Sequence, residues 1–434
     1  MPTVAFATLG CKVNQVETEQ IKEDFYRHGY QEVGFQEAAD VYVINTCTVT
    51  HVSDRKSRAV IRRAARKNPD AFIVVTGCLA QTDAEEVAEI EGVNLIVGSG
   101  PKQDVAALTE ERIKKNGTAL QVVRPRVTID MKPRRILYQE HHQRTRAFVK
   151  VQDGCQSFCS YCIVPYSRGP MRSKLPEDVL EEIRQLLRLG YHEIVLTGIH
   201  VGYYGSELPG WNLLRLVRTI LDEIPGEYRL RLGSIEAVGF PVELAALSKQ
   251  DDRLCSHFHI PLQSGSSAVL KQMNRRYSRE KFYEIIQAVD KAAPSAAFTT
   301  DIMVGFPGET EEDFQQSYDL IHELPFFDLH VFKYSKRPGT PAAARADQIP
   351  EDVKHERSSR LLALAEEKKD AFMKRFQGKI MRVLAERQID ENLWLGLTDE
   401  YVEVKMYSEK NIHGQFLQVK LGEIQNHVFW GEIV

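Results

Sequence analysis

The first hundred residues alternate short runs of apolar, β-branched residues with longer segments in which apolar residues recur every three or four positions. The short runs predict strands at residues 3–8, 41–45, 72–76 and 94–98, and the longer patterns predict helices near 16–28, 52–67 and 82–90. This alternation is typical of a parallel sheet with helices on its faces. The pattern therefore predicts an α/β domain over residues 1–115.

A second series of the same kind begins near residue 147. Its six strand-like runs lie at 147–151, 193–198, 228–234, 257–261, 298–306 and 328–334. Six βα units predict an open (βα)6 barrel over 147–350, with its active site at the carboxyl ends of the strands. A charged connecting helix is expected at 351–376, and short β runs between Gly and Asn turns predict a small β-barrel at 377–434.

The segment between the two series, residues 116–146, is polar and basic. Residues 124–146 contain seven Lys or Arg and two Asp or Glu, and Pro125 and Pro133 interrupt any helix. We expect it to be a linker between domains.

Composition places few limits on function. The chain of 434 residues is 43% hydrophobic and 27% charged, with a net charge of -4, so a nucleic-acid partner must be bound by a local basic patch. One candidate is the predicted helix at 55–67, with seven basic residues and no acidic ones, in which Arg62 and Arg63 would contact phosphates. The alternative is a solvated helix face. No export signal or long apolar segment is found, so we expect a cytoplasmic protein without membrane spans.

The seven cysteines are too few for a disulfide scaffold of this size, which favours ligand chemistry. Cys255, before a strand-like run, is expected to be a buried apolar residue. Cys11, Cys47 and Cys78 each lie within about four residues of the carboxyl end of a predicted strand. Because ligands bind at that edge of a parallel sheet, we expect these three thiols to converge.

The other three cysteines form a C-x3-C-x2-C motif after the first barrel strand, at Cys155, Cys159 and Cys162. Three such thiolates can hold three irons of a cubane cluster and leave the fourth iron open. A structural zinc site would need a fourth ligand, and His141 and His142 belong to the linker. The iron–sulfur interpretation is therefore favoured.

This motif, with Tyr161 as its aromatic residue, resembles the signature of the radical S-adenosylmethionine (radical SAM) superfamily. The resemblance implies that Cys155, Cys159 and Cys162 bind a 4Fe-4S cluster, that Tyr161 belongs to the cofactor site, and that SAM is cleaved to a 5'-deoxyadenosyl radical. It also implies that the ends of the second and fifth barrel strands bind SAM. The residues concerned are Thr197, Gly198 and Gly305. The alternative for either glycine is a tight turn.

The chain is similar over its whole length to the methylthiotransferase family, through the motifs around the first three cysteines. These motifs are Leu9-Gly10-Cys11-Lys12-Val13-Asn14, Asn45-Thr46-Cys47 and Thr76-Gly77-Cys78. In that family these cysteines hold a second 4Fe-4S cluster that carries the sulfur, and the terminal barrel is the RNA-binding TRAM domain. The resemblance thus implies two 4Fe-4S clusters, SAM, a tRNA substrate, an electron donor such as flavodoxin or ferredoxin, and a sulfur source that it does not identify.

Residues 197–205 and 234–236 resemble the subfamily that modifies N6-threonylcarbamoyladenosine at tRNA position 37, on carbon 2 of the base. The carboxylate of that group needs a cation and hydrogen-bond donors. His200 and Tyr203 would supply donors, and Lys336 or Arg337 the charge. The alternatives are isopentenyladenosine in tRNA, an aspartate of a small-subunit ribosomal protein, or a scaffold that carries clusters without catalysis.

Overall fold

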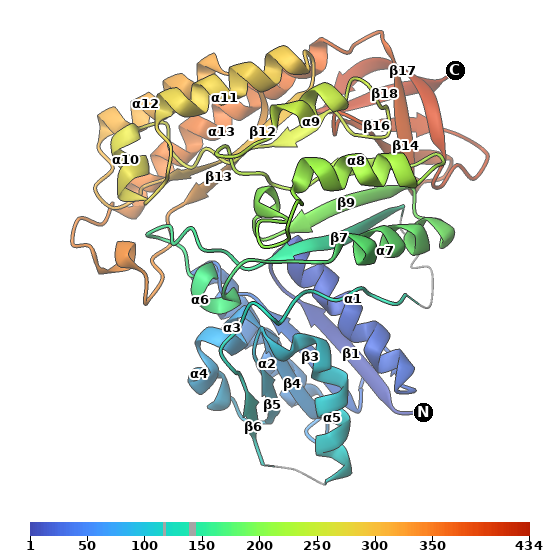
Figure 1. Cartoon of the computed structure of the whole chain (residues 1–434), viewed down its shortest axis with the longest axis vertical. Coiled ribbons are helices and arrows are strands. Elements are labelled where there is room, and N and C mark those ends of the chain that lie inside the picture. Colours follow the sequence, from blue (N-terminus) through green and yellow to red (C-terminus); the bar gives the residue numbers. More distant parts are fainter. Residues whose placement is uncertain (116–118, 139–144) are drawn as a thin grey trace.

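The computed structural model describes residues 1–115, 119–138 and 145–434. Three parts follow one another along the chain: an α/β sheet, an open barrel and a small closed barrel (Figure 1). This is the architecture predicted from the hydrophobic pattern. His141 and His142 lie outside the described residues.

The N-terminal part is a six-stranded parallel sheet in the order β2-β1-β3-β4-β5-β6. Its elements are β1 (Thr3–Thr8), α1 (Lys12–Arg27), β2 (Gln31–Glu32), β3 (Val41–Thr46), α2 (His51–Lys67), β4 (Phe72–Gly77), α3 (Cys78–Thr82), α4 (Ala84–Ala88), β5 (Val93–Val97), α5 (Val105–Lys114) and β6 (Gln121–Val123). Every residue of β3 is buried because helices cover both faces of the sheet.

Two expectations for this region were wrong in detail. The segment at 121–123, predicted as linker, pairs with β5 and extends the sheet. The helix predicted near 82–90 is two shorter helices, because the chain leaves the helical conformation at Asp83, with φ -130° and ψ 41°. The linker also packs inward, since Ile136 and Tyr138 are buried in the central core.

The central part contains all six predicted barrel strands, arranged in two parallel halves. Strands β10, β9 and β7 form one half, β11, β12 and β13 form the other, and a parallel bridge at Leu230 and Leu254 joins them. The elements are β7 (Arg146–Asp153), α6 (Val164–Arg168), β8 (Arg172–Ser173), α7 (Pro176–Arg188), β9 (Glu193–Gly198), α8 (Leu213–Glu223), β10 (Arg229–Leu232), α9 (Val242–Leu247), β11 (His257–His259), α10 (Ser267–Gln272), α11 (Arg279–Ala292), β12 (Ala297–Val304), α12 (Glu311–Glu323) and β13 (Phe326–Lys333).

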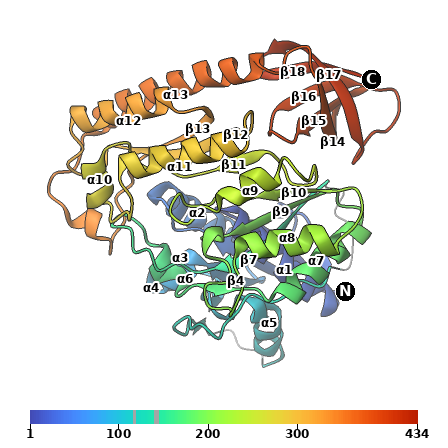
Figure 2. The ribbon, with the colours of Figure 1, turned by 45° about the horizontal axis from the view of Figure 1, so that its top comes forward.

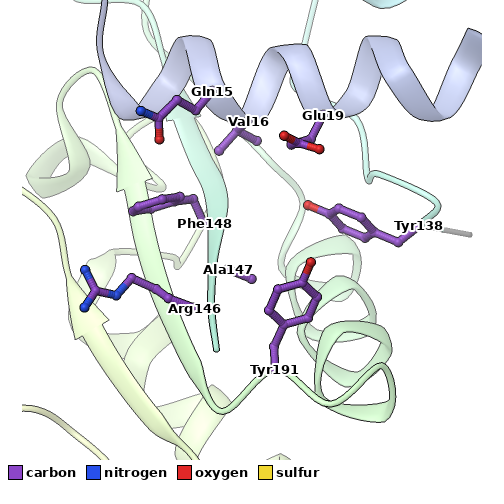
Figure 3. A pocket seen from close by; sticks show the side chains of 8 residues that line it. All are labelled: Gln15, Val16, Glu19, Tyr138, Arg146, Ala147, Phe148 and Tyr191. Carbon is purple, nitrogen blue, oxygen red and sulfur yellow. The ribbon is translucent and has the colours of Figure 1, made fainter. Parts of the chain in front are cut away.

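Helix α1 of the N-terminal part lies across β7, the first strand of the central barrel (Figure 3). Val16 is buried in the core of the central part, and Gln15 and Glu19 line a small cavity with Phe148. The two α/β parts therefore share a packed interface that α1 forms.

Helix α13 (Glu351–Lys374) runs along the central part to the C-terminal barrel (Figure 2). This barrel closes in the order β14-β15-β16-β18-β17. Its strands are β14 (Ile380–Asp390), β15 (Leu393–Thr398), β16 (Glu403–Tyr407), β17 (Phe416–Gln425) and β18 (Val428–Ile433). Among the described residues, no helix is long and apolar enough to cross a membrane.

The C-terminal barrel contacts the amino ends of the central strands. Tyr401 stacks on His257, with ring centroids 4.9 Å apart. Beside it, Glu193 at the start of β9 is ion-paired with the arginines at 146, 229 and 231. Burial alone would raise the pKa of Glu193, but the three guanidinium charges hold it well below its ordinary value.

Candidate active site

The three N-terminal cysteines converge at the carboxyl edge of the sheet, as predicted. Gly10 has φ +99°, and a Cβ on it would lie 2.7 Å from Cys47 Sγ, so the loops after β1 and β3 touch. Asn14 joins the same loops by donating to the carbonyls of Leu9 (2.7 Å) and Thr46 (3.0 Å). Burial raises the pKa of the Cys47 thiol, and the nearby Cys78 and Cys11 add to that rise.

The other three cysteines lie in the loop after β7. The Cys162 N–H donates to the Cys159 carbonyl (2.9 Å), and the Cys155 N–H donates to the Gly169 carbonyl (3.1 Å). All three are partly exposed. Burial raises the pKa of Cys162 to about 12, a rise that metal binding would offset by stabilising the thiolate.

A group of polar side chains adjoins this loop. Arg275 donates to the Tyr161 hydroxyl (2.8 Å) and to Glu236 (2.6 Å), so the Tyr161 ring is held in place beside the cysteines. The His200 N–H donates to Gln152 Oε1 (2.7 Å), and burial lowers the pKa of His200. Its ring packs against Tyr203, with centroids 4.2 Å apart.

The three residues expected to contact SAM lie at strand ends. Thr197 and Gly198 close β9, and a Cβ on Gly198 would lie 2.8 Å from the Gln152 carbonyl. Gly305 follows β12 with φ +72°, donates to Glu309 (2.6 Å) and packs on the Lys354 side chain. Close approach of the Gln152 backbone thus explains Gly198, and the positive φ together with the packed Lys354 side chain explains Gly305. Contact of either glycine with SAM stays a prediction.

A buried ionic network links the two sets of cysteines. Arg168, 1% exposed, donates to Asn14 (2.6 Å) and Glu17 (2.8 Å) of α1 and to Asp153 (3.1 Å) of β7. Lys150 also donates to Glu17 (2.9 Å). Two further cations belong to the network: Lys102 forms an ion pair with Glu17, and Arg172 forms one with Asp153. The sequence did not reveal this network, although Lys150 and Asp153 are buried charges in the first barrel strand.

A second contact links the parts near Cys47. Arg337, 4% exposed, donates to Asp54 of α2 and to Thr48. The His51 N–H donates to Ser335 Oγ (3.2 Å). The charge of Arg337 is therefore neutralised inside the protein, so we do not assign it to a substrate.

The two sets of thiols are not arranged as a site for a single metal ion. Within the described residues, the only three Cys, His, Asp or Glu ligand atoms that lie within 4.8 Å of one another belong to His259, Asp301 and His330. Neither set of cysteines is thus gathered tightly enough for a single ion. The buried network has four cations and two carboxylates, and the charges of Cys78 and Cys11 raise the pKa of Arg168 against the effect of burial. The network therefore carries a positive surplus beside the N-terminal cysteines.

The basic helix is α2, as predicted, and its outer face is exposed. Arg62 and Arg63 are exposed, with the Arg63 guanidinium 5.4 Å from the ring centroid of Phe35. Arg58 instead pairs with Glu86. With a rise of about 1.5 Å per residue, Arg62 lies about 16 Å along the axis from the cysteine end of α2.

A group of three polar side chains that the sequence did not reveal lies on β11, β12 and β13. Asp301 faces His259 Nε2 (3.3 Å) and His330 Nδ1 (3.2 Å), and the two imidazole rings stack with centroids 5.2 Å apart. Lys12, next to Cys11, places its Nζ 5.9 Å from the ring centroid of Phe148 on β7. These side chains come from distant segments, so no local motif in the sequence predicts that they meet.

Comparison with known families agrees with this division of the chain. Residues 3–98 match the model described as uncharacterized protein family UPF0004, and residues 149–321 match the radical SAM superfamily. The first match covers Cys11, Cys47 and Cys78, and the second covers Cys155, Cys159 and Cys162.

Curated relatives are similar over nearly the whole chain. The threonylcarbamoyladenosine tRNA methylthiotransferase MtaB of Bacillus subtilis is 43% identical over 97% of this chain and 94% of its own length. That of Aquifex aeolicus is 38% identical over 96% of this chain and 99% of its own. The tRNA-2-methylthio-N(6)-dimethylallyladenosine synthase of Methylacidiphilum infernorum is 35% identical over 99% of this chain and 94% of its own.

Solved structures share the fold at low sequence identity. The radical S-adenosylmethionine methyltransferase TsrM from Kitasatospora setae, with cobalamin and a 4Fe-4S cluster bound, superposes with a TM-score of 0.63 at 14% identity, over 79% of this chain and 73% of that one. The cobalamin-dependent enzyme OxsB gives 0.55 at 12% identity, over 85% and 61%.

Proposed function

The chain belongs to the radical SAM tRNA methylthiotransferases, and on that premise we propose that it adds a methylthio group to carbon 2 of N6-threonylcarbamoyladenosine at tRNA position 37. The observation that carries the proposal is the pair of cysteine sets joined by the buried network of Arg168 and Glu17. The names of the relatives at 43% and 38% identity support the choice of nucleoside.

Each set of cysteines has its own role in the proposal. Cys155, Cys159 and Cys162 would hold the 4Fe-4S cluster that binds SAM, and the N-terminal set would hold a second cluster. When bound, these groups supply the radical that activates an aromatic C–H and the sulfur that replaces its hydrogen.

The residues of the chain provide placement. Arg168 and Arg337 fix the N-terminal cysteines against the central barrel from two sides, so the distance between the cysteine sets is set by packed side chains. Arg275 and Glu236 form a buried pair that holds Tyr161 beside the loop of Cys159. Such rigidity is what a reaction between two bound groups requires.

We assign tRNA binding to two exposed surfaces. The outer face of α2, with Arg62 and Arg63, would contact phosphates. On the C-terminal barrel, which we take as TRAM-like, Tyr407 stacks on Trp430 at 5.6 Å and Lys405 lies 5.4 Å from the same indole. Tyr407 is exposed and Trp430 is partly exposed, and such an aromatic pair beside a cation suits an unpaired base. We also propose a cytoplasmic location and electron supply by a flavodoxin or ferredoxin.

Nucleoside mass spectrometry tests the substrate. The reconstituted enzyme should methylthiolate tRNA that carries the threonylcarbamoyl group, and tRNA from cells that lack this modification should stay unchanged. Undiminished reaction on the second tRNA, or selective reaction on isopentenyladenosine, would reject the proposed nucleoside. Modification of the ribosomal protein's aspartate would reject tRNA altogether.

Cysteine variants test the division of labour. Wild-type protein should bind about eight irons, because two four-iron clusters are proposed. Cys162→Ala should abolish SAM cleavage, whereas Cys78→Ala should still cleave SAM and leave RNA without sulfur. Cys255→Ala, a buried cysteine outside both sets, is the matched control. Equal loss of SAM cleavage in the first two variants would contradict the assignment.

A further inference from the structure

The proposed nucleoside carries a carboxylate on its N6 substituent, and a cation in the binding site must neutralise it when water is excluded. Arg337 does not serve, because Asp54 already pairs with it. The cation must therefore be another side chain that faces the space between the two cysteine sets.

Lys12 is the candidate. It is the residue after Cys11 and the first of α1, and its Nζ lies over Phe148 on the first barrel strand. Burial lowers its pKa, and the charges of Tyr401 and Glu193 oppose that shift, so a carboxylate bound beside Lys12 would favour its charged form. Lys12 is also close enough to His330 for its charge to oppose protonation of that imidazole. Lys12 thus extends from the residue after Cys11 over β7, within reach of the charge of His330 on β13.

His330 is the second group. Its side chain is 55% exposed, and its Nδ1 faces Asp301 at 3.2 Å, so Nε2 on the opposite side of the ring points away from that carboxylate. Asp301 also faces His259 Nε2, while His259 Nδ1 lies 2.9 Å from Thr299 Oγ1. Both nitrogens of His259 therefore have partners within the protein, whereas His330 has a partner among the described residues only at Nδ1.

We propose that Lys12 and His330 bind the carboxylate of the threonylcarbamoyl group, with His259 and Asp301 as positioning residues. The assignment rests on the proposed function. Hydrogen bonding to Asp301 raises the pKa of His330, which favours the ring form that donates from both nitrogens.

The covalent structure of the nucleoside agrees with this placement. Carbon 2 must meet the sulfur held near Cys11, and the N6 substituent leaves the adenine ring beyond N1, directed away from carbon 2. A side chain that starts one residue from Cys11 and reaches toward Phe148 can meet that substituent. An isopentenyl group would leave both Lys12 and His330 desolvated without a partner, which costs binding free energy.

The same imidazoles and carboxylate have a spacing that a divalent ion accepts. The nearby Lys12 argues against this use, because its charge repels a cation and attracts an anion. The surroundings of the group therefore favour a carboxylate ligand.

Binding of anticodon stem-loops to the reconstituted enzyme, measured by fluorescence anisotropy without reductant, tests the assignment. The RNAs carry at position 37 adenosine, threonylcarbamoyladenosine, its neutral methyl ester, or isopentenyladenosine. Wild-type enzyme should bind the acid at least about tenfold more tightly than the ester, the factor that corresponds to about 1.4 kcal/mol. Lys12→Met should remove most of this ratio, and His330→Phe should reduce it several-fold.

Lys22→Met is the matched control, because Lys22 lies on the same helix and pairs with Glu32 (2.8 Å) away from the barrel. It should keep the wild-type ratio. If Lys12→Met fails to fold, the exposed His330 still allows the decision. The assignment is overturned if Lys12→Met keeps the wild-type ratio of acid to ester binding. If Lys12→Met does not fold, the same result in His330→Phe overturns it. Equal binding of acid and ester by wild type also overturns it. Preference of the wild type for isopentenyladenosine would instead reject the proposed substrate.

Discussion

Glu17 is the side chain on which the junction between the two cysteine sets depends most. It is 3% exposed and accepts from Lys102, Lys150 and Arg168, which come from three separate segments. Burial would raise its pKa, but these cations hold the pKa well below the ordinary glutamate value. Glu17→Gln keeps the shape of the side chain and removes its charge.

The expected loss is large because the cations remain buried. The network would change from four cations and two carboxylates to four and one. Removing one partner of a buried ion pair typically costs about 3–5 kcal/mol. With an m-value of about 3 kcal/mol/M, the urea midpoint of unfolding should fall by about 1–1.7 M.

Far-ultraviolet circular dichroism across a urea series measures this midpoint. Glu111→Gln is the control, since Glu111 forms a surface pair with Lys115 on α5 and should leave the midpoint unchanged. Iron content should be determined alongside, because bound clusters stabilise the folded state by mass action. A Glu17→Gln midpoint within error of the Glu111→Gln midpoint would refute the role given to the network.

Three further outcomes are expected. Charge reversal at Arg62 and Arg63 should weaken tRNA binding and flatten its salt dependence, because fewer counterions are released, and an unchanged slope would leave α2 as a solvated face. Wild type should be more stable than Glu193→Gln by its full margin above about pH 4.3, the ordinary glutamate pKa, and by less as the pH falls below it, because the folded pKa of Glu193 is depressed. Urea midpoints of both proteins at several pH values measure this margin. A margin that does not change with pH would contradict the prediction. Asp54→Asn should lower RNA methylthiolation more than RNA-independent SAM cleavage, because Asp54 and Arg337 position the loop of Cys47 only; equal loss in both assays would show a general folding effect.

The hydrophobic pattern was sufficient to predict where the strands lie, because each strand corresponds to a local run of apolar residues. All six central strands and the five-stranded barrel lie where apolar runs predicted them. Strand β6 was missed because Gln121 to Val123 is short and lies on a sheet edge, where pairing with β5 decides its conformation. The convergence of Cys11, Cys47 and Cys78 was predictable because parallel strands share one carboxyl edge.

Charged residues were the main source of error, because a sequence does not show which charges meet. Lys336 or Arg337 was predicted to supply a cation to the substrate, yet Arg337 is buried against Asp54, 283 positions earlier in the chain. Arg168 was not predicted to have a role, although it contacts Glu17, which lies 151 positions earlier in the chain. Such pairs form only when two separately folded sheets pack together, so their partners become visible only in the assembled structure.

Helix α1 connects the proposed sulfur delivery to the proposed substrate selection. Asn14 and Glu17, three residues apart, share the face that contacts Arg168. Lys12 and Val16, four residues apart, share the face toward Phe148, and Figure 3 shows Val16 on that side. Inserting one residue after Lys12 would rotate Lys12 by about 100° relative to Asn14, Val16 and Glu17, so Lys12 would lose its contact with Phe148 if Asn14 and Glu17 keep theirs with Arg168. One rigid helix therefore fixes where the sulfur site and the carboxylate site stand relative to each other.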